Sequence, residues 1–248
     1  MQYCGLDIAG VSSYVFVTDA QGRKLAAGFV ATTRAALEAR LRPFLRGGLA
    51  VAIEAGNQTA WIYEVLTALG AQVTVVNPNK VKLIAESRRK TDKIDAGLLC
   101  ELLRLGGLPE PVHMPGRQIR ALRGLLVARR QLVAARTKVC NVVRGLLRQE
   151  GVRLPSRALM SWIGWQRLVE QGFEHEHLAV IVAAYSETFR RLTQSIQELE
   201  RELAEREKRD ARAARLQTMP RVGRIAFLTF LAAVDDVSRF ASSRKLVG

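Results

Sequence analysis

The sequence predicts an α/β domain with a mixed sheet, followed by an α-helical region. Two observations point to this fold class. Residues 1–77 alternate short β-prone runs with segments of helical period, whereas the chain from Lys80 onward has a mostly helical pattern. The segment GGLPEPVHMPG (106–116), with three prolines, interrupts the helical part. A chain of 248 residues, 48% of them hydrophobic, can bury one large core or two smaller ones.

The elements of the first part follow from local pattern and turn chemistry. They are strands at 2–9, 13–20 and 24–31, a helix at about 33–46 capped by Thr32 or Thr33, a strand at 48–55, a helix at 61–70 and a strand at 71–77. Gly-Val-Ser at 10–12 and a turn at 19–22 join the first three strands. Leu37, Leu41 and Leu45 recur every fourth residue of the first helix, and Gly70 closes the second. A three-strand meander followed by alternating helix and strand is the order of the ribonuclease-H-like fold.

The segment 117–148 predicts a basic amphipathic helix. It carries nine cations and no acid: Arg117, Arg120, Arg123, Arg129, Arg130, Arg136, Lys138, Arg144 and Arg148. Its apolar stripe comprises Leu122, Leu126, Val133, Cys140, Val143 and Leu147. A merely solvated basic face would usually contain glutamates one turn away. The pattern therefore favours unneutralised cations that contact nucleic-acid phosphates.

Two further helical segments carry interpretable patterns. A long helix at about 176–210 has apolar residues at heptad spacing: Tyr185, Phe189, Leu192, Ile196, Leu199 and Leu203. The seam can pack on its own chain or form a coiled-coil dimer contact, and we favour the dimer. The segment TMPRVGRIAFLTFLAAV (218–234) is similar to a helix-hairpin-helix, in which backbone N–H groups at a helix start bind a phosphate.

The charge balance narrows the class of partner. The formal net charge of +15 favours a polyanion, most often nucleic acid, although a generally arginine-rich proteome would give the same bias. The three cysteines show no paired spacing, which is typical of a reducing compartment. The chain has no run of 18 apolar residues and no signal-peptide pattern. We therefore expect a soluble cytoplasmic protein without a membrane partner.

Four acids stand out as candidate metal ligands. Asp7 in GLDIAG and Glu54 in AIEAG end predicted buried strands, where a carboxylate is costly unless something pairs with it. Asp92 and Asp95 in KTDKIDA are three residues apart, so they share one helix face. Four converging carboxylates repel one another unless hard cations such as magnesium (Mg2+) neutralise them. Two such ions would suit phosphodiester chemistry.

The ordered motifs GLDIAG, AIEAGNQTAW, VVNPNKVK and KTDKIDA resemble the DEDD transposases of bacterial insertion sequences, the "IS one-ten" family of bridge-RNA-guided recombinases. The resemblance covers essentially the whole chain, and KTDKIDA after NPNKVK is its most specific part. It implies a RuvC-like domain, a coiled coil and a transposase domain whose serine attacks DNA. Carried over by motif, Asp7, Glu54, Asp92 and Asp95 form the catalytic, Mg2+-binding tetrad.

The resemblance also implies domain boundaries and a nucleic-acid surface. The domains would be a RuvC-like domain with the long basic helix at 1–155, a helical coiled-coil region at 156–215 and the beginning of the transposase domain at 216–248. DNA and a structured guide RNA would contact these residues: Lys80, Lys82, Arg88, Arg89, Lys90, Lys93, Arg129, Arg130, Arg136, Lys138 and Arg144. A homo-oligomer through the 176–210 helix is expected.

The sequence departs from the family pattern near its end. The family serine stands in a Ser-Gly context, which neither Ser242 nor Ser243 matches, and Arg221 replaces the usual hairpin glycine. We therefore expect a truncated chain that binds nucleic acid but does not recombine DNA alone. Its apolar residues at 225–231 should then lack cover, and residues 216–248 should be poorly ordered or paired with another chain.

Three other readings stay open. A RuvC-like, metal-dependent junction nuclease would use all four acids and need no serine. A catalytically silent nucleic-acid-binding fragment would keep the basic surface alone. An actin-like kinase shares the broad fold, but GLDIAGVSS lacks its glycine-rich phosphate loop.

Overall fold

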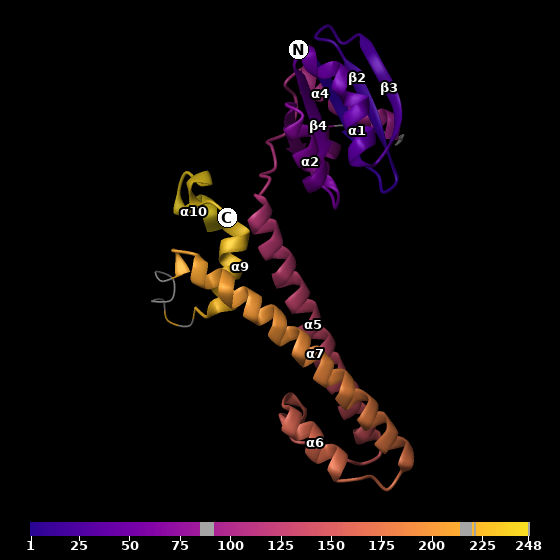
Figure 1. The fold of residues 1–248 in the computed structure, drawn as a ribbon, viewed down its shortest axis with the longest axis vertical. Helices are drawn as coiled ribbons and strands as arrows, with labels where there is room; N and C mark the ends of the chain where they lie inside the picture. Colours follow the sequence, from indigo (N-terminus) through magenta and orange to yellow (C-terminus); the bar gives the residue numbers. More distant parts are fainter. Residues whose placement is uncertain (85–91, 214–219, 221, 248) are drawn as a thin grey trace. The chain divides into compact units, whose positions relative to one another are not determined.

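The computed structural model describes the chain except residues 85–91, 214–219, 221 and 248, and it leaves the side chains of 82–84, 92–94 and 247 undescribed (Figure 1). The chain forms two compact units, Met1–Met114 and Pro115–Gly248. The basic helix belongs to the second unit by its contacts. The domain boundaries at 155 and 215 stay a proposal. Among the described residues, no helix is long and apolar enough to cross a membrane.

The first unit is built on one five-stranded sheet. Its strands are β1 (Gln2–Asp7), β2 (Ser12–Thr18), β3 (Lys24–Ala31), β4 (Leu49–Glu54) and β5 (Gln72–Val76). The strand order is β3-β2-β1-β4-β5, with β2 antiparallel to both β1 and β3 and with β1, β4 and β5 parallel. This is the ribonuclease-H-like order, so the predicted fold class is confirmed.

The helices of this unit are α1 (Arg34–Leu41), α2 (Thr59–Ala68), α3 (Pro78–Ile84) and α4 (Asp92–Arg104). Thr33 caps α1, because its hydroxyl accepts a hydrogen bond from the Ala36 N–H. The helix predicted at 33–46 continues after Leu41 as a 3₁₀ segment, η1 (Arg42–Gly47), in which Pro43 occupies the first turn. Gly70 follows α2 with φ +90°, as its predicted closing role requires.

The two faces of the sheet are covered differently. On one face, Leu6, Val15 and Ile53 are fully buried in a core to which α1 and α2 contribute leucines and isoleucine. Helix α4 covers the opposite face, which we call the α4 face. A Cβ on Gly5 would overlap the carbonyl oxygen of Ala96, so only glycine permits this close approach. A second core cluster, including Ala52 and Leu99, lies on the α4 face.

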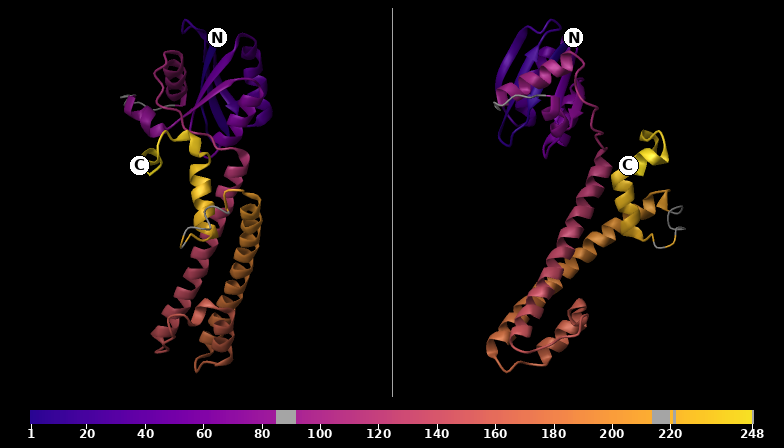
Figure 2. Two further views of the ribbon diagram at one scale, coloured as in Figure 1. Left: turned by 90° about the vertical axis from the view of Figure 1, so that its left-hand side faces the viewer. Right: turned by 180° about the vertical axis from the view of Figure 1, so that it is seen from behind.

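The second unit is α-helical. Its elements are α5 (Arg117–Gln149), η2 (Ala158–Met160), α6 (Trp162–Glu170), α7 (Glu176–Arg209), α9 (Arg224–Val234), η3 (Val237–Arg239) and α10 (Ser243–Val247). Helices α5 and α7 run side by side, and Figure 2 shows the pair in two views. Trp165 of α6, Phe189 of α7 and Leu147 of α5 are buried in one core.

The structure bears on two expectations for this unit. The heptad seam of α7 packs on α5 of the same chain: Phe189 joins Val139 and Val143 in one core, and Leu203 joins Leu122 in another. The seam is thus buried within the chain at Phe189, Ile196 and Leu203 and half-buried at Tyr185, Leu192 and Leu199, and the dimer contact stays a prediction. The predicted uncovered patch at 225–231 is wrong at three positions. Phe227, Leu228 and Leu231 are buried against α5 and α7, although Phe230 stays 43% exposed.

Candidate functional site

The candidate site begins with two acids at the ends of adjacent parallel strands. Asp7 is the last residue of β1 and Glu54 is the last residue of β4. The register pairs Leu6 with Ile53, so Asp7 and Glu54 come next on their strands and point to the same side, the α4 face. Both are half-buried. The structure thus places two of the four predicted carboxylates side by side at the carboxyl end of the sheet.

Polar side chains fix the backbone directly beyond these acids. The Thr59 hydroxyl donates to the Glu54 carbonyl oxygen (2.7 Å) and accepts from the Gly56 N–H (2.8 Å). The Gln58 amide donates to the carbonyl oxygens of Ala9 and Gly10 (3.2 Å each), which links the segment after β4 to the segment after β1. Both acids therefore extend from restrained backbone, as a preorganised ligand site requires.

Thr32, directly after β3, supports the same segment. Its hydroxyl donates to the Ala9 carbonyl oxygen (2.9 Å), and it shares a second hydrogen bond with the Ser13 hydroxyl (2.8 Å). The sequence reasoning missed these supports. Gln58 and Thr59 belong to the motif AIEAGNQTAW, and their place in this motif is the sequence signal that could have identified them.

Helix α4 brings the other two acids to this edge of the sheet. The Cys100 thiol donates to the Tyr3 carbonyl oxygen (3.2 Å), whereas Ala96 lies over Gly5. Residue numbers decrease along α4 as they increase along β1, so α4 runs antiparallel to β1. One helical turn of about 5.4 Å roughly matches two strand residues, so the first turn of α4, with Asp92 and Asp95, lies level with Asp7.

The structure does not close a metal site from the side chains it describes. Among them, no three His, Cys, Asp or Glu groups come close enough to hold one ion. Asp7, Glu54 and Asp95 belong to that described set, whereas the side chain of Asp92 lies outside it. Sulfur ligands are unsuited here, because burial raises the pKa of both the Cys4 and the Cys100 thiols. The carboxylates stay the candidate ligands.

Of the predicted basic residues near KTDKIDA, the structure describes the side chain of Lys80. Lys80 is on α3, and its ammonium lies 4.0 Å from the carboxylate of Glu110, both exposed. The structure does not describe the side chains of Lys82 and Lys93, nor residues Arg88, Arg89 and Lys90.

The nine cations of α5 divide into two groups. Five are half-buried and contact the chain itself: Arg120, Arg123, Arg129, Arg136 and Arg144. The other four are exposed and have no ion-pair or hydrogen-bond partner among the described residues: Arg117, Arg130, Lys138 and Arg148. The prediction that the whole basic face is unneutralised is therefore wrong for Arg129, whereas Arg123 and Arg144 donate to carbonyl oxygens and Arg136 lies over the Phe189 ring. The Arg129 guanidinium lies 2.6 Å from the carboxylate of Glu200 on α7.

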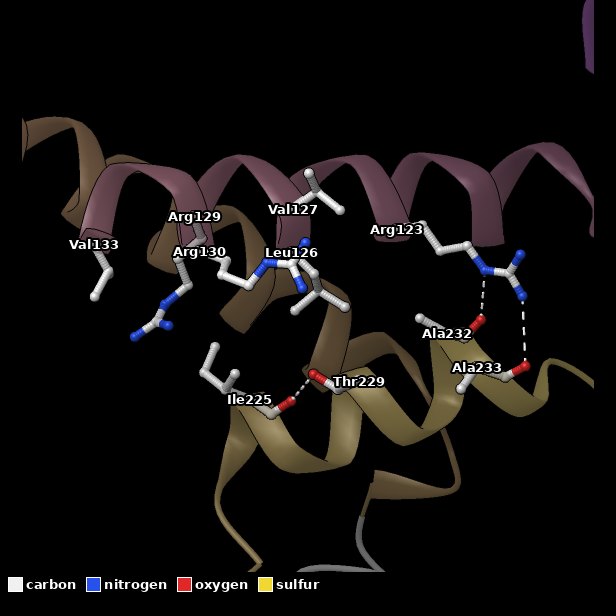
Figure 3. A pocket seen from close by; sticks show the side chains of 10 residues that line it. All are labelled: Arg123, Leu126, Val127, Arg129, Arg130, Val133, Ile225, Thr229, Ala232 and Ala233. Atoms are coloured by element: carbon white, nitrogen blue, oxygen red, sulfur yellow. Dashed lines mark hydrogen bonds between the residues drawn. The ribbon is translucent and has the colours of Figure 1, made fainter. Parts of the chain in front are cut away.

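Figure 3 shows where part of the first group lies. A pocket of about 450 Å³ opens between α5 and α9, lined by Arg123, Arg129 and Arg130 from α5 and by Ile225 and Thr229 from α9. Arg123 donates to the carbonyl oxygens of Ala232 (2.7 Å) and Ala233 (3.5 Å) near the end of α9. A positive charge is favourable at the carboxyl end of a helix, so Arg123 stabilises the packing of α9 on α5.

The turn of the predicted helix-hairpin-helix falls partly outside the described residues. Positions 218, 219 and 221 are not described, and α9 begins after Gly223. Arg224, in its first turn, forms a 2.5 Å ion pair with the buried carboxylate of Glu207. Because Glu207 places negative charge near this helix start, the described part of the segment does not favour phosphate binding.

Comparisons with known proteins agree with the sequence-based family prediction. Residues 4–151, more than half of the chain, match the family model described as Transposase (DEDD_Tnp_IS110). Residues 213–248 match the model described as Transposase IS116/IS110/IS902 family. A solved RuvC structure from Thermus thermophilus is similar at 17% identity and a TM-score of 0.34, covering 45% of this chain and 100% of that chain. No curated protein matches the chain.

Proposed function

This chain belongs to the DEDD transposase family of IS110 elements. We therefore propose that it binds DNA and a structured guide RNA. As a site-specific recombinase, it would mediate transposition of an insertion sequence. One observation carries the proposal. Asp7 and Glu54 end adjacent parallel strands, and the first turn of α4, with Asp92 and Asp95, lies at the same edge of the sheet.

The four carboxylates are the kind of donor that Mg2+ takes, although Asp7, Glu54 and Asp95 do not form a three-ligand site in this structure. Asp7 and Glu54 are neighbours on one face, so one cation bound there would interact with both carboxylates. Hard oxygen ligands are those that Mg2+ prefers. When bound, the ion would supply positive charge at the reacting phosphodiester oxygens. The chain's own contribution is to hold the carboxylates in place through Gln58, Thr59 and the packing of α4 on Gly5.

The proposed nucleophile is a serine, and neither serine near residue 242 is assigned that role. The Ser242 hydroxyl accepts a hydrogen bond from the Lys245 N–H (3.4 Å), so it caps α10. Ser243 is the first residue of that short helix. Neither stands in the family's Ser-Gly context.

The nucleic-acid surface that we propose on α5 is narrower than the sequence indicated. Arg130, Lys138 and Arg148 are exposed and have no partner among the described residues. At 100° per residue they fall within about 80° of the helix circumference, spread over about 27 Å of its length. They can therefore contact several non-adjacent phosphates along one strand. A separate proposed surface of the first unit comprises Lys80, Lys82, Arg88, Arg89, Lys90 and Lys93, which are close to Asp92 in the sequence.

The experiment measures thermal unfolding with and without Mg2+ for the wild type, Asp7→Asn and Glu110→Gln. An ion that binds only the folded state at 100 times its Kd stabilises by about 2.7 kcal/mol. We expect Mg2+ to stabilise the wild type and Glu110→Gln, whose exposed carboxylate lies outside the tetrad, but to stabilise Asp7→Asn much less. Equal Mg2+ stabilisation of all three proteins would refute the proposed site.

A second candidate function is a RuvC-like junction nuclease, because four acids suffice for it and Ser242 already serves as a helix cap. The purified chain is incubated with branched DNA and Mg2+. Nicking that Glu54→Gln abolishes would favour the nuclease. Guide-RNA-dependent joining of paired DNA substrates, lost in the same variant, would favour the recombinase.

A further inference from the structure

One row of side chains crosses the sheet at the level of the candidate acids. The register pairs Asp7 with Tyr14 across β1 and β2, and Tyr14 with Phe29 across β2 and β3. Directly opposed residues of antiparallel strands point to the same face. Glu54 extends the row on the other side of Asp7. Two aromatic rings therefore stand on the α4 face in line with the two carboxylates.

The two rings differ sharply in exposure. Tyr14 is 7% exposed, whereas Phe29, on the edge strand β3, is 65% exposed. Their centroids are 4.9 Å apart and their planes are 85° to each other, the edge-to-face geometry that aromatic pairs prefer. Tyr14 thus supports Phe29 from one side and leaves most of the Phe29 ring in contact with solvent.

The spacing of the row matches the size of a nucleotide. Neighbouring strands lie about 4.7–4.9 Å apart, so two strand spacings place Phe29 about 10 Å from Asp7. One nucleotide spans a similar distance from its phosphate to the far edge of its base. A strand whose phosphate reaches Asp7 and Glu54 can therefore lay an unpaired base on Phe29.

We propose that Phe29, supported by Tyr14, is a stacking platform for one unpaired base of a nucleic-acid strand bound at the carboxylates. The inference rests on the function proposed above, which brings a phosphate to Asp7 and Glu54. Stacking accepts any base, because every base has a π-face. The platform therefore adds affinity for single strands without base-specific hydrogen bonds, and it acts on an unpaired nucleotide of either DNA or RNA.

The test compares Phe29→Ala, Phe29→Trp and Leu25→Ala in binding to short single-stranded DNA, single-stranded RNA and duplex DNA. Leu25 is the matched control, because it is an exposed apolar residue (46%) of the same strand, four residues or about 13 Å from Phe29. Loss of one base stack should weaken binding by about 5- to 150-fold. We expect this loss for Phe29→Ala with at least one single strand, unchanged duplex binding and an unchanged salt slope. The single strand that shows the loss identifies the source of the base.

Phe29→Trp and Leu25→Ala should bind as the wild type does. A bound single strand should quench the fluorescence of the new tryptophan. Equal single-strand affinity of Phe29→Ala and wild type would overturn the platform. Conversion of an oligomer to a monomer by both alanine variants would instead assign β3 to a contact between copies. The Asp7→Asn experiment separates the two proposals. If Mg2+ stabilises the wild type but not Asp7→Asn, and Phe29→Ala binds single strands as tightly as the wild type, only the platform is refuted. Failure to bind any nucleic acid would refute both.

Discussion

Replacing Gly5 by alanine tests how closely α4 must approach the sheet. The new Cβ would overlap the Ala96 carbonyl oxygen and lie 2.6 Å from the Cys100 nitrogen. Ordinary contact begins at about 3.4 Å, so the nitrogen alone requires α4 to retreat by about 0.8 Å, and the oxygen requires more. Both obstacles are helix backbone, which cannot rotate away as a side chain can. Overpacking of this kind costs about 1–3 kcal/mol, and we expect the upper end of that range.

The same retreat would carry the first turn of α4 away from Asp7. Gly5→Ala should therefore lose stability and also lose part of the stabilisation by Mg2+. Urea unfolding, followed by circular dichroism with and without Mg2+, measures both effects. Gly97→Ala is the control on the same helix, because its Cβ meets nothing within 4 Å, and it should gain up to about 1 kcal/mol from helix propensity. An unfolding free energy of Gly5→Ala within about 0.5 kcal/mol of the wild type would refute the packing argument.

Two further predictions concern individual charges. Arg129→Ala should lower the unfolding free energy by up to about 1 kcal/mol, because the Glu200 ion pair is lost, and it should leave the salt dependence of nucleic-acid binding unchanged. Arg130→Ala should leave stability unchanged and flatten the slope of log affinity against log salt concentration by about 0.7–0.9. Binding titrations at several salt concentrations measure the slope, and a flatter slope for Arg129→Ala but not for Arg130→Ala would contradict the division of the α5 cations into two groups. Hydrogen bonds from Arg190 and a neighbouring arginine lower the pKa of Glu187 from 4.5 to about 2, so its contribution to stability is fully present above pH 4.5 and is lost as the pH falls toward 2. NMR titration of Glu187 should show this midpoint, and Arg190→Ala should raise it; a wild-type midpoint near 4.5 would show that these bonds do not persist in solution.

The strands and helices of the first unit could be predicted from the sequence, because local interactions decide them. Thr33 caps its helix within three residues, and Gly70 ends α2 through its own positive φ. The turn at Asp19 closes on backbone groups of residues 21 and 23. These are contacts between near neighbours, so the pattern of residue types already contains them. Asp7 and Glu54 were predicted from local pattern too, as carboxylates at the ends of apolar strands, and Asp92 and Asp95 from their three-residue spacing on a helix.

Only the tertiary structure decided which groups meet. The parallel pairing of β1 with β4 places Asp7 beside Glu54, 47 positions later in the chain, and β2 and β3 place Phe29 in the same row. In α5, Arg129 and Arg130 are adjacent and chemically identical, yet one pairs with Glu200 and the other is exposed. A helical pattern shows that a face is basic, but the partner of each cation depends on which distant helix packs there. The sequence by itself determined the family, the elements and the candidate carboxylates; long-range packing alone determined which cations are neutralised and what covers each apolar seam.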